Sequence, residues 1–306
     1  MDHSKPNMSK EFKTNEYHKG EYKFTEEGNL KNSKKEGLWR TYIHFEIQLV
    51  EGGILKPGEE RKITNSGRYG KSLFKDETFV KGKLDGPYSE YYWDIEGEWK
   101  RREGFYKNGE KNGEWINHGR HSGHDHYNYK NGKKDGPFKS YQQGWVTPKK
   151  HSTNILTREG SYKDGKLHGN YKSYNFENSH HKSYIISDLN YKNGQLHGYC
   201  KYYQLYPYYG VREREGEMKN GKTIGTWSYY NYNGTELKYE IEHISEKEYI
   251  HFNYSDRLIL SSESHYKRKN KDDVVTLKRI LYHPDGTLRS KTIWDEDGEF
   301  IDRKEY

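Results

Sequence analysis

A short motif built around two glycines recurs seven times and constrains the fold more than any other feature of the chain. Its clearest copies read YKDGKLHGNY at 162–171 and YKNGQLHGYC at 191–200. Six copies keep both glycines, and all seven keep the second one. The second glycines are Gly37, Gly86, Gly113, Gly136, Gly169, Gly198 and Gly225. Since the motif is constant while the connecting segments vary in length, each copy is expected to form one unit of a repeat protein.

The first glycine of the motif predicts a β-hairpin in each copy. Five copies carry Asn-Gly or Asp-Gly here, which is the strongest short hairpin signal because both central residues of a type I′ turn need a positive φ. With a two-residue turn at 164–165, Tyr162 lies opposite Leu167. Regular pairing then places Gly160 opposite Gly169. The same count pairs three further sets of glycines: Gly28 with Gly37, Gly104 with Gly113, and Gly216 with Gly225.

An aromatic column follows from the alternation of side chains along a strand. The residues two positions after the second glycine are Trp39, Tyr88, Trp115, Phe138, Tyr171, Cys200 and Trp227. Strand glycines leave room for a neighbouring ring to lie flat on the backbone. Cys200 is interpreted as a small buried hydrophobe. A second set of tyrosines, five after the same glycine, either covers the opposite face or is returned by a bulge, and the sequence leaves this open.

Composition supports thin β-structure. Hydrophobic residues make up 30% of the 306 residues, against ~45–50% in ordinary domains, yet there are 31 Tyr, 10 Phe and 7 Trp. The sequence predicts an all-β fold, an elongated antiparallel β-meander in which repeated hairpins form a ribbon. Residues 1–25 are expected to be an arm or a degenerate strand, 26–240 the repeat ribbon, and 241–306 a C-terminal β cap. The insertion at 43–78 is expected to be an extra hairpin or a longer loop. Whether the ribbon continues across 43–78 and 142–160 is left open.

The unit Tyr-Lys-x-Gly-Lys-x-x-Gly-x-aromatic-x-x-Tyr resembles the variant MORN repeat of bacterial proteins, over residues 26–240. The resemblance implies a MORN-like sheet of β-hairpins that binds other molecules. Many members of that family are labelled as antitoxins of toxin–antitoxin systems. A neutralised toxin or effector is therefore the partner that the resemblance implies.

Charge and cysteine content suggest a setting for this binding. The chain has 53 Lys and Arg against 46 Asp and Glu, a net charge of +7, which favours a partner with an acidic surface. Its single cysteine rules out an internal disulfide framework. No apolar run approaches the ~18 residues of a membrane-spanning helix, and the N-terminus lacks the apolar core of a signal peptide. A cytoplasmic location is expected.

Catalytic chemistry is not apparent in the motifs. The segment INHGRHSGHDHYNY contains four histidines: His118, His121, His124 and His126. Histidine is a common ligand of Zn²⁺ and Ni²⁺. An exposed polar loop is the preferred interpretation, and a metal site there is the alternative. No nucleophile elbow, phosphate loop or HExxH motif occurs. The chain is therefore predicted to be no enzyme and to need no cofactor.

The predicted function is binding to a protein partner, which the chain would neutralise or inhibit by occlusion, as an antitoxin, an immunity protein or an inhibitor of a bacterial or phage defence complex does. A nucleic-acid-binding module that uses lysine and aromatic side chains is the alternative, and a metal-dependent enzyme is the third hypothesis. The predicted contact residues lie in connectors, where the repeat requires no ring: Phe45, Trp93, Trp99, Trp145, Tyr206, Tyr208 and Tyr209.

Overall fold

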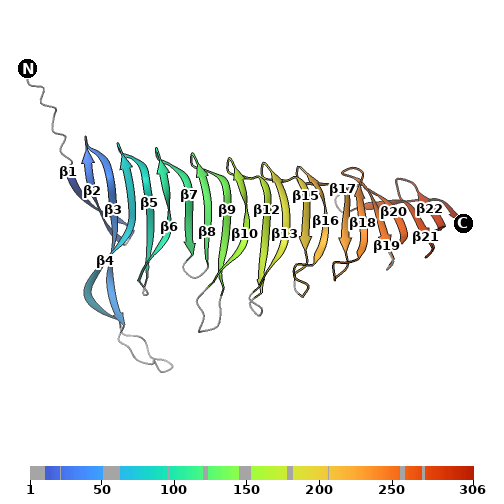
Figure 1. The fold of residues 1–306 in the computed structure, drawn as a ribbon, viewed down its shortest axis with the longest axis horizontal. Coiled ribbons are helices and arrows are strands. Elements are labelled where there is room, and N and C mark those ends of the chain that lie inside the picture. Colours follow the sequence, from blue (N-terminus) through green and yellow to red (C-terminus); the bar gives the residue numbers. More distant parts are fainter. Residues whose placement is uncertain are drawn as a thin grey trace, which may run out of the picture. The chain divides into compact units, whose positions relative to one another are not determined.

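The structure is a computed structural model that describes residues 11–20, 22–50, 63–94, 97–119, 123–144, 153–177, 182–205, 207–255, 259–270 and 273–306. The chain divides into two units, Met1–Asp135 and Gly136–Tyr306. Described strands belong to an antiparallel sheet of 23 strands and follow one another in meander order (Figure 1). The predicted all-β antiparallel meander of repeated hairpins is confirmed.

Strand bounds follow the repeat. The first unit contains β1 (Glu11–Lys19), β2 (Tyr22–Lys31), β3 (Lys34–Val50), β4 (Ile63–Val80), β5 (Lys83–Asp94), β6 (Gly97–Lys107), β7 (Glu110–Gly119) and β8 (Gly123–Lys130). Strand β9 (Lys133–Gly144) begins at the boundary. The second unit continues with β10 (Thr153–Lys163), β11 (Lys166–Leu167), β12 (Gly169–Glu177), β13 (Lys182–Lys192), β14 (Gln195–Leu196), β15 (Gly198–Tyr203), β16 (Arg212–Lys219), β17 (Lys222–Tyr230), β18 (Leu237–His243), β19 (Glu248–Tyr254), β20 (Leu260–Arg268), β21 (Val274–Tyr282), β22 (Leu288–Trp294) and β23 (Phe300–Glu305).

Each copy of the motif forms the predicted type I′ turn. In all seven copies both central residues have a positive φ, between 49° and 52° at the first position and between 59° and 90° at the second. This holds even for Lys81 and for Asn32-Ser33, where the favoured dipeptide is missing. The predicted pairing of Tyr162 with Leu167 is present. We call the ends of the strands that carry these turns the turn edge, and the opposite ends the connector end.

The predicted pairing of glycine with glycine is wrong, because the second glycine forms a bulge. In the first copy Asn29 pairs with Glu36, but the next pair is Gly28 with Trp39, so Gly37 and Leu38 bulge out of the ladder. All seven second glycines have a positive φ, between 58° and 136°, a conformation that costs glycine little. The bulge shifts the register and brings the aromatic column opposite the strand glycine.

Three copies place an indole directly on a glycine. A Cβ atom at Gly28, Gly104 or Gly216 would lie within 2.5 Å of the ring of Trp39, Trp115 or Trp227. Each indole Nε1 also donates a hydrogen bond, of 2.9–3.0 Å, to the carbonyl oxygen of the residue after that glycine. A buried carbonyl without a partner costs about 1–3 kcal/mol. The tryptophan therefore fills the space over the glycine and also satisfies a carbonyl beside the bulge.

In the sixth copy the large and the small side chain change places between the strand-glycine position and the aromatic column. Leu189 stands in the glycine position and Cys200 in the aromatic column, and these side chains are buried together with Trp227 and Met218 of the seventh copy. Cys200 is fully buried, as predicted for a small hydrophobe, and burial raises the pKa of its thiol. A larger side chain in the strand is thus matched by a smaller one in the column.

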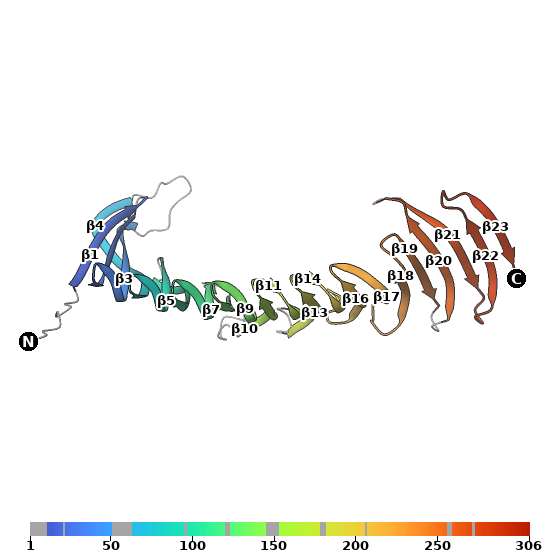
Figure 2. The ribbon, with the colours of Figure 1, turned by 90° about the horizontal axis from the view of Figure 1, so that it is seen from above.

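The core of each unit lies on one face of its sheet, which we call the ring face. Trp39 and Trp115 are each 1% exposed, although no described element forms a second layer over them (Figure 2). Neighbouring rings and lysine stems provide the cover: the Nζ of Lys111 lies 4.0 Å from the Trp115 ring centroid, and that of Lys35 lies 4.3 Å from the Trp39 centroid. Burial lowers the pKa of Lys111.

The second set of tyrosines covers the opposite face, which we call the tyrosine face. The register shifts by one residue at each of these tyrosines, and the unpaired residue lies on the following strand. The strand that carries the tyrosine has no bulge there, so its side chains continue to alternate between the two faces. Tyr174 donates a hydrogen bond of 2.8 Å to Glu159, and Tyr230 one of 2.6 Å to Glu215. Burial and Glu159 raise the pKa of Tyr174 to about 12.

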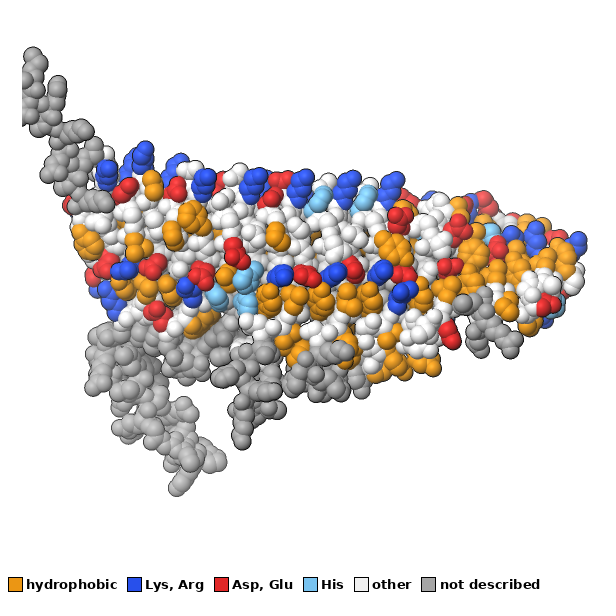
Figure 3. Space-filling model, viewed as in Figure 1, with side chains coloured by type: hydrophobic (Ala, Val, Ile, Leu, Met, Phe, Trp, Pro, Cys, Tyr) orange, Lys and Arg blue, Asp and Glu red, His pale blue; other side chains and the backbone are white. Residues whose placement is uncertain are grey.

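Charges of opposite sign alternate along the tyrosine face. Lysine Nζ atoms lie 3.9–4.0 Å from carboxylates on the next strand, and Figure 3 shows the row over β9–β16. The pairs are Lys139 with Glu159, Lys172 with Asp188, and Lys201 with Glu215. Partly exposed pairs of this kind contribute little stability, about 0–1 kcal/mol each, and only the Glu215 carboxylate is buried.

The segments outside the repeat are also β-structure where the structure describes them. Residues 11–19 form β1, which pairs with β2. The 43–78 insertion extends a hairpin of β3 and β4 whose pairing continues to Val50 with Ile63. Residues 241–306 continue the meander to β23. Over the described part of the chain there is no helix with the length and apolarity that a membrane crossing requires.

The contact between Gly216 and Trp227 gives a prediction. Gly216→Ala should lower the free energy of unfolding by about 1–3 kcal/mol, because the added methyl group overlaps the indole. In the Trp227→Leu background most of this cost should vanish. Denaturant unfolding of the four proteins in the double-mutant cycle measures the coupling. Equal costs of Gly216→Ala in both backgrounds would show that the indole does not depend on the glycine.

Two histidines on the ring face of the second unit predict acid sensitivity. Burial lowers the pKa of His243 and His251, and the charge of Arg268 lowers that of His243 further. The unfolded chain has an ordinary histidine pKa of about 6.5, so it binds more protons than the folded chain at mildly acidic pH. The free energy of unfolding should therefore fall as the pH drops from about 7 to about 5.

The variant His251→Phe tests this. Phenylalanine keeps a ring beside Tyr239, whose centroid lies 4.7 Å from that of His251, but it cannot be protonated. The loss of stability between about pH 7 and about pH 5 should be smaller in this variant than in the unaltered protein. An unchanged pH dependence, measured by denaturant unfolding, would contradict the prediction.

Candidate functional site

Five apolar or aromatic side chains gather at the connector end of the second unit, between β13 and β18. The rings of Tyr208 and Tyr232 lie 5.4 Å apart, and those of Tyr184 and Tyr209 are stacked at 5.2 Å with an interplanar angle of 21°. Together with Leu205 they form what we call the connector patch. Figure 3 shows hydrophobic side chains gathered at this end of the strands.

The loop after β15 holds Tyr208 in place. The backbone N–H of Gln204 donates to Val211 O at 2.7 Å, and that of Tyr208 donates to Leu205 O at 2.9 Å. Gly210 completes the turn with a φ of 74° and lies against the Tyr184 ring. The loop therefore presents Tyr208 and Tyr209 from a backbone closed by hydrogen bonds.

The loop after β17 holds Tyr232 in a similar way. The Asn231 backbone N–H donates to Glu236 O at 3.0 Å, and the Gly234 N–H donates to Asn231 O at the same distance. The Asn231 side chain also donates to the Glu236 carboxylate at 2.7 Å. This loop is closed both through its backbone and through its side chains.

The two loops pack against each other. The side-chain amide of Gln204 donates to Asn231 O at 2.8 Å. A Cβ atom at Gly234, whose φ is 69°, would lie 2.3 Å from the Cγ1 of Val211. Glycine is therefore required there both by its backbone conformation and by the approach of the other loop.

The patch is nevertheless open to solvent. Tyr232 is 66% exposed, Leu205 57% and Tyr208 43%. A tyrosine offers a large apolar surface with a polar tip, and exposed tyrosines held in place are the side chains that most often anchor protein interfaces. The arrangement provides a contact surface.

The structure brings together only part of the predicted contact set. Tyr208 and Tyr209 belong to the connector patch. Trp99 lies on β6 in the other unit, where its ring is 5.4 Å from that of Tyr92. The remaining predictions fall outside what is described: Trp145 and Tyr206 themselves, and the side chains of Phe45 and Trp93.

The interpretation as an exposed loop is wrong for three of the histidines, since His118 lies on β7 and His124 and His126 lie on β8, all half-buried. His118 Nε2 lies 3.1 Å from a carboxylate oxygen of Glu103, and His126 Nδ1 lies 2.9 Å from one of Glu114. The rings of His124 and His126 are 5.0 Å apart. His121 lies outside the described residues. Within the described part of the chain no three His, Cys, Asp or Glu side chains are grouped as metal ligands.

Sequence reasoning missed Tyr184, Leu205 and Tyr232. Tyr232 could have been found from the sequence, because it belongs to an aromatic run in a connector, Tyr-Tyr-Asn-Tyr at 229–232. Tyr184 lies at the start of β13, and nothing in the sequence shows that the loop after β15 places Tyr209 on its ring. Gln204, which joins the loops, had no signal of its own.

Comparison of the chain with models of protein families and with curated proteins found no match.

Gln204 gives a prediction about the patch. Gln204→Ala removes the hydrogen bond to Asn231 O, so the loop at 231–236 should open more often. Hydrogen exchange of the amides of Asn231 and Gly234 should become faster by about three- to tenfold, in line with the ~0.5–1.5 kcal/mol of one hydrogen bond. Amides in β13 serve as an internal control. Unchanged exchange at both positions would show that the loops are held independently.

Proposed function

We propose that the chain is a non-enzymatic binding protein that engages a partner protein through the connector patch and neutralises it by occlusion. The observation that carries the proposal is the exposure of Tyr208 and Tyr232 on two loops that are closed by hydrogen bonds and joined by Gln204. Exposed apolar side chains that a fold does not need for its own core are typical of interaction sites.

Rigidity favours this patch as an anchor. Ordering a flexible side chain on binding costs about 0.5–1.5 kcal/mol, and much of that cost is avoided when loop and ring are already held. Tyr208 packs against Tyr232, and Tyr209 packs against Tyr184. The patch therefore resembles the aromatic anchors at the centre of protein interfaces.

The partner class comes from the repeat. Resemblance to the variant MORN repeat favours a toxin, an effector or a component of a defence complex as the protein that is neutralised. The net charge of +7 favours an acidic partner surface. A partner inside the cell fits the single, fully buried cysteine.

Nucleic-acid binding is the second candidate, and it rests on the turn edge. Lysines flank the turns there, including Lys163, Lys166, Lys192 and Lys219. Affinity for phosphates would fall steeply with salt, with log K linear in log salt. Substituting Tyr208 and Tyr232 of the connector patch with alanine would leave this binding unchanged, because the lysines lie at the opposite ends of the strands.

The test is affinity purification from the native host with nuclease treatment, comparing the unaltered chain with Tyr208→Ala/Tyr232→Ala. A stoichiometric protein should be recovered with the unaltered chain and lost, by about tenfold or more, with the double variant. Tyr306→Ala is the matched control, because Tyr306 is 57% exposed and lies outside the patch. Equal recovery with all three proteins, or recovery that depends on nucleic acid, would contradict the proposal.

A further inference from the structure

A cavity lies at the turn edge of the second unit, where the repeat ends. Its volume is about 500 Å³, and it is formed by β17, the turn before it, and strands β18, β19 and β20. Sites for small molecules usually occupy ~300–1,000 Å³. The cavity is at the opposite ends of the strands from the connector patch, so its role is independent of the proposed function.

A single short side chain explains why a cavity opens here. The residue two after the turn carries a long side chain in the first six copies and a short one in the seventh: Lys35, Leu84, Lys111, Lys134, Leu167, Leu196 and Thr223. In earlier copies this side chain lies over the core, as Lys35 and Lys111 do over tryptophan rings and as Leu196 does against the buried cluster. Thr223 is too short to fill the same volume.

The wall of the cavity is apolar and held in place. Ile241 and Tyr249 line it. The Tyr249 ring is stacked on that of Tyr266, with centroids 5.1 Å apart and an interplanar angle of 23°. An organic ring or chain would therefore meet a preformed surface, which lowers the cost of binding.

The charges that line the cavity do not cancel. Lys222 forms an ion pair with Glu246, which holds the pKa of that carboxyl below its usual range. Arg268 also lines the cavity, and within the described residues its guanidinium has no carboxylate partner. Its neighbours Lys267 and Lys269 point to the other face and reach carboxylates at 2.6 Å and 2.9 Å.

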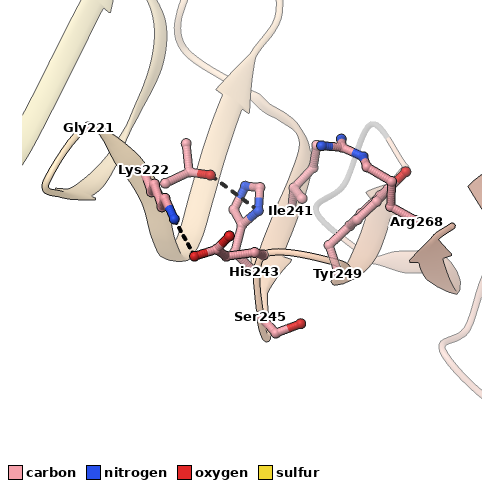
Figure 4. A pocket seen from close by; sticks show the side chains of 9 residues that line it. Gly221, Lys222, Ile241, His243, Ser245, Tyr249 and Arg268 are labelled. Carbon is pink, nitrogen blue, oxygen red and sulfur yellow. Dashed lines mark hydrogen bonds and ion pairs between the residues drawn. The ribbon is translucent and has the colours of Figure 1, made fainter. Parts of the chain in front are cut away.

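The free guanidinium lies close to further polar groups. In Figure 4 the Arg268 side chain extends from β20 toward Ile241 and the other labelled residues. Burial lowers the pKa of His243 and the charge of Arg268 lowers it further, and Arg268, His243 and Tyr249 line the same cavity. His243 Nδ1 lies 3.3 Å from the hydroxyl of Thr223. Arginine, imidazole and hydroxyl groups thus lie around one apolar wall.

We propose that this cavity binds a small organic anion, with a phosphate or carboxylate on Arg268 and His243 and a ring or chain against Tyr249 and Ile241. The planar guanidinium matches either anionic group through two parallel hydrogen bonds. The apolar wall requires a body larger than an inorganic ion. A bound ligand would couple the repeat to the strands at 241–268, since β17 carries Thr223 and β20 carries Arg268.

Isothermal titration calorimetry of the full chain tests the proposal with four probes: phenyl phosphate, benzoate, inorganic phosphate and benzyl alcohol. Phenyl phosphate or benzoate should bind, and the tighter of the two identifies the head group. Inorganic phosphate and benzyl alcohol should each bind at least about tenfold more weakly, because each lacks one half of the recognition. Equal affinity of either of these probes, or no binding of any probe, would overturn the proposal.

Variants locate the binding. Thr223→Leu restores the residue of the fifth and sixth copies, so it should keep the fold, fill the cavity and weaken binding by about tenfold or more. Arg268→Gln should have a similar effect on the anionic probes. Arg279→Gln, at an exposed position on β21, is the matched control and should leave binding unchanged. Binding that survives both cavity variants would place the anion elsewhere.

Discussion

The contact between an aromatic ring and the backbone of the preceding strand is the interaction on which this structure depends. A single-layered sheet has no second layer to bury its side chains, so its core must form within one face. The bulge at the second glycine moves the ring opposite the strand glycine, where Trp39 and Trp115 are buried almost completely. Burying a side chain of this size contributes about 1.5–3 kcal/mol or more, and Trp39, Trp115 and Trp227 each obtain this against a glycine of their own hairpin.

The hairpins could be predicted from the sequence because each turn depends on the conformational preference of two adjacent residues. Asn-Gly and Asp-Gly favour positive φ, and the flanking residues then pair by count, as Tyr162 does with Leu167. The register beyond the second glycine was not predictable in the same way. A glycine in a sequence is compatible with an extended strand residue, as Gly28 is, and with a left-handed bulge residue, as Gly37 is. Only the space around Trp39 decides between them.

Residues of the functional surfaces were predictable where their own position in the sequence marks them, and not where their role depends on contacts with distant segments. Tyr208 and Tyr209 stand out in sequence because the repeat requires no ring at their positions. Tyr184 does not, since its contact with Tyr209 depends on a loop that returns from another hairpin. The cavity at the turn edge did leave a signal, because Thr223 interrupts a column of lysine and leucine. Its lining residue Arg268 lies beyond the repeat, in the basic run at 267–271, which by itself indicates only a solvated loop.

The exchange of Gly and Trp for Leu189 and Cys200 has an evolutionary consequence. The strand-glycine position and the aromatic column share one buried space within the same hairpin, so a larger side chain at one requires a smaller one at the other. A change at one position is therefore best tolerated when the other changes with it. Among descendants of this chain, substitutions should be inherited in pairs with the separation of Gly28 from Trp39. Whole hairpins, by contrast, can be duplicated or lost as intact modules, so that lineages differ in repeat number more readily than in the make-up of any one repeat.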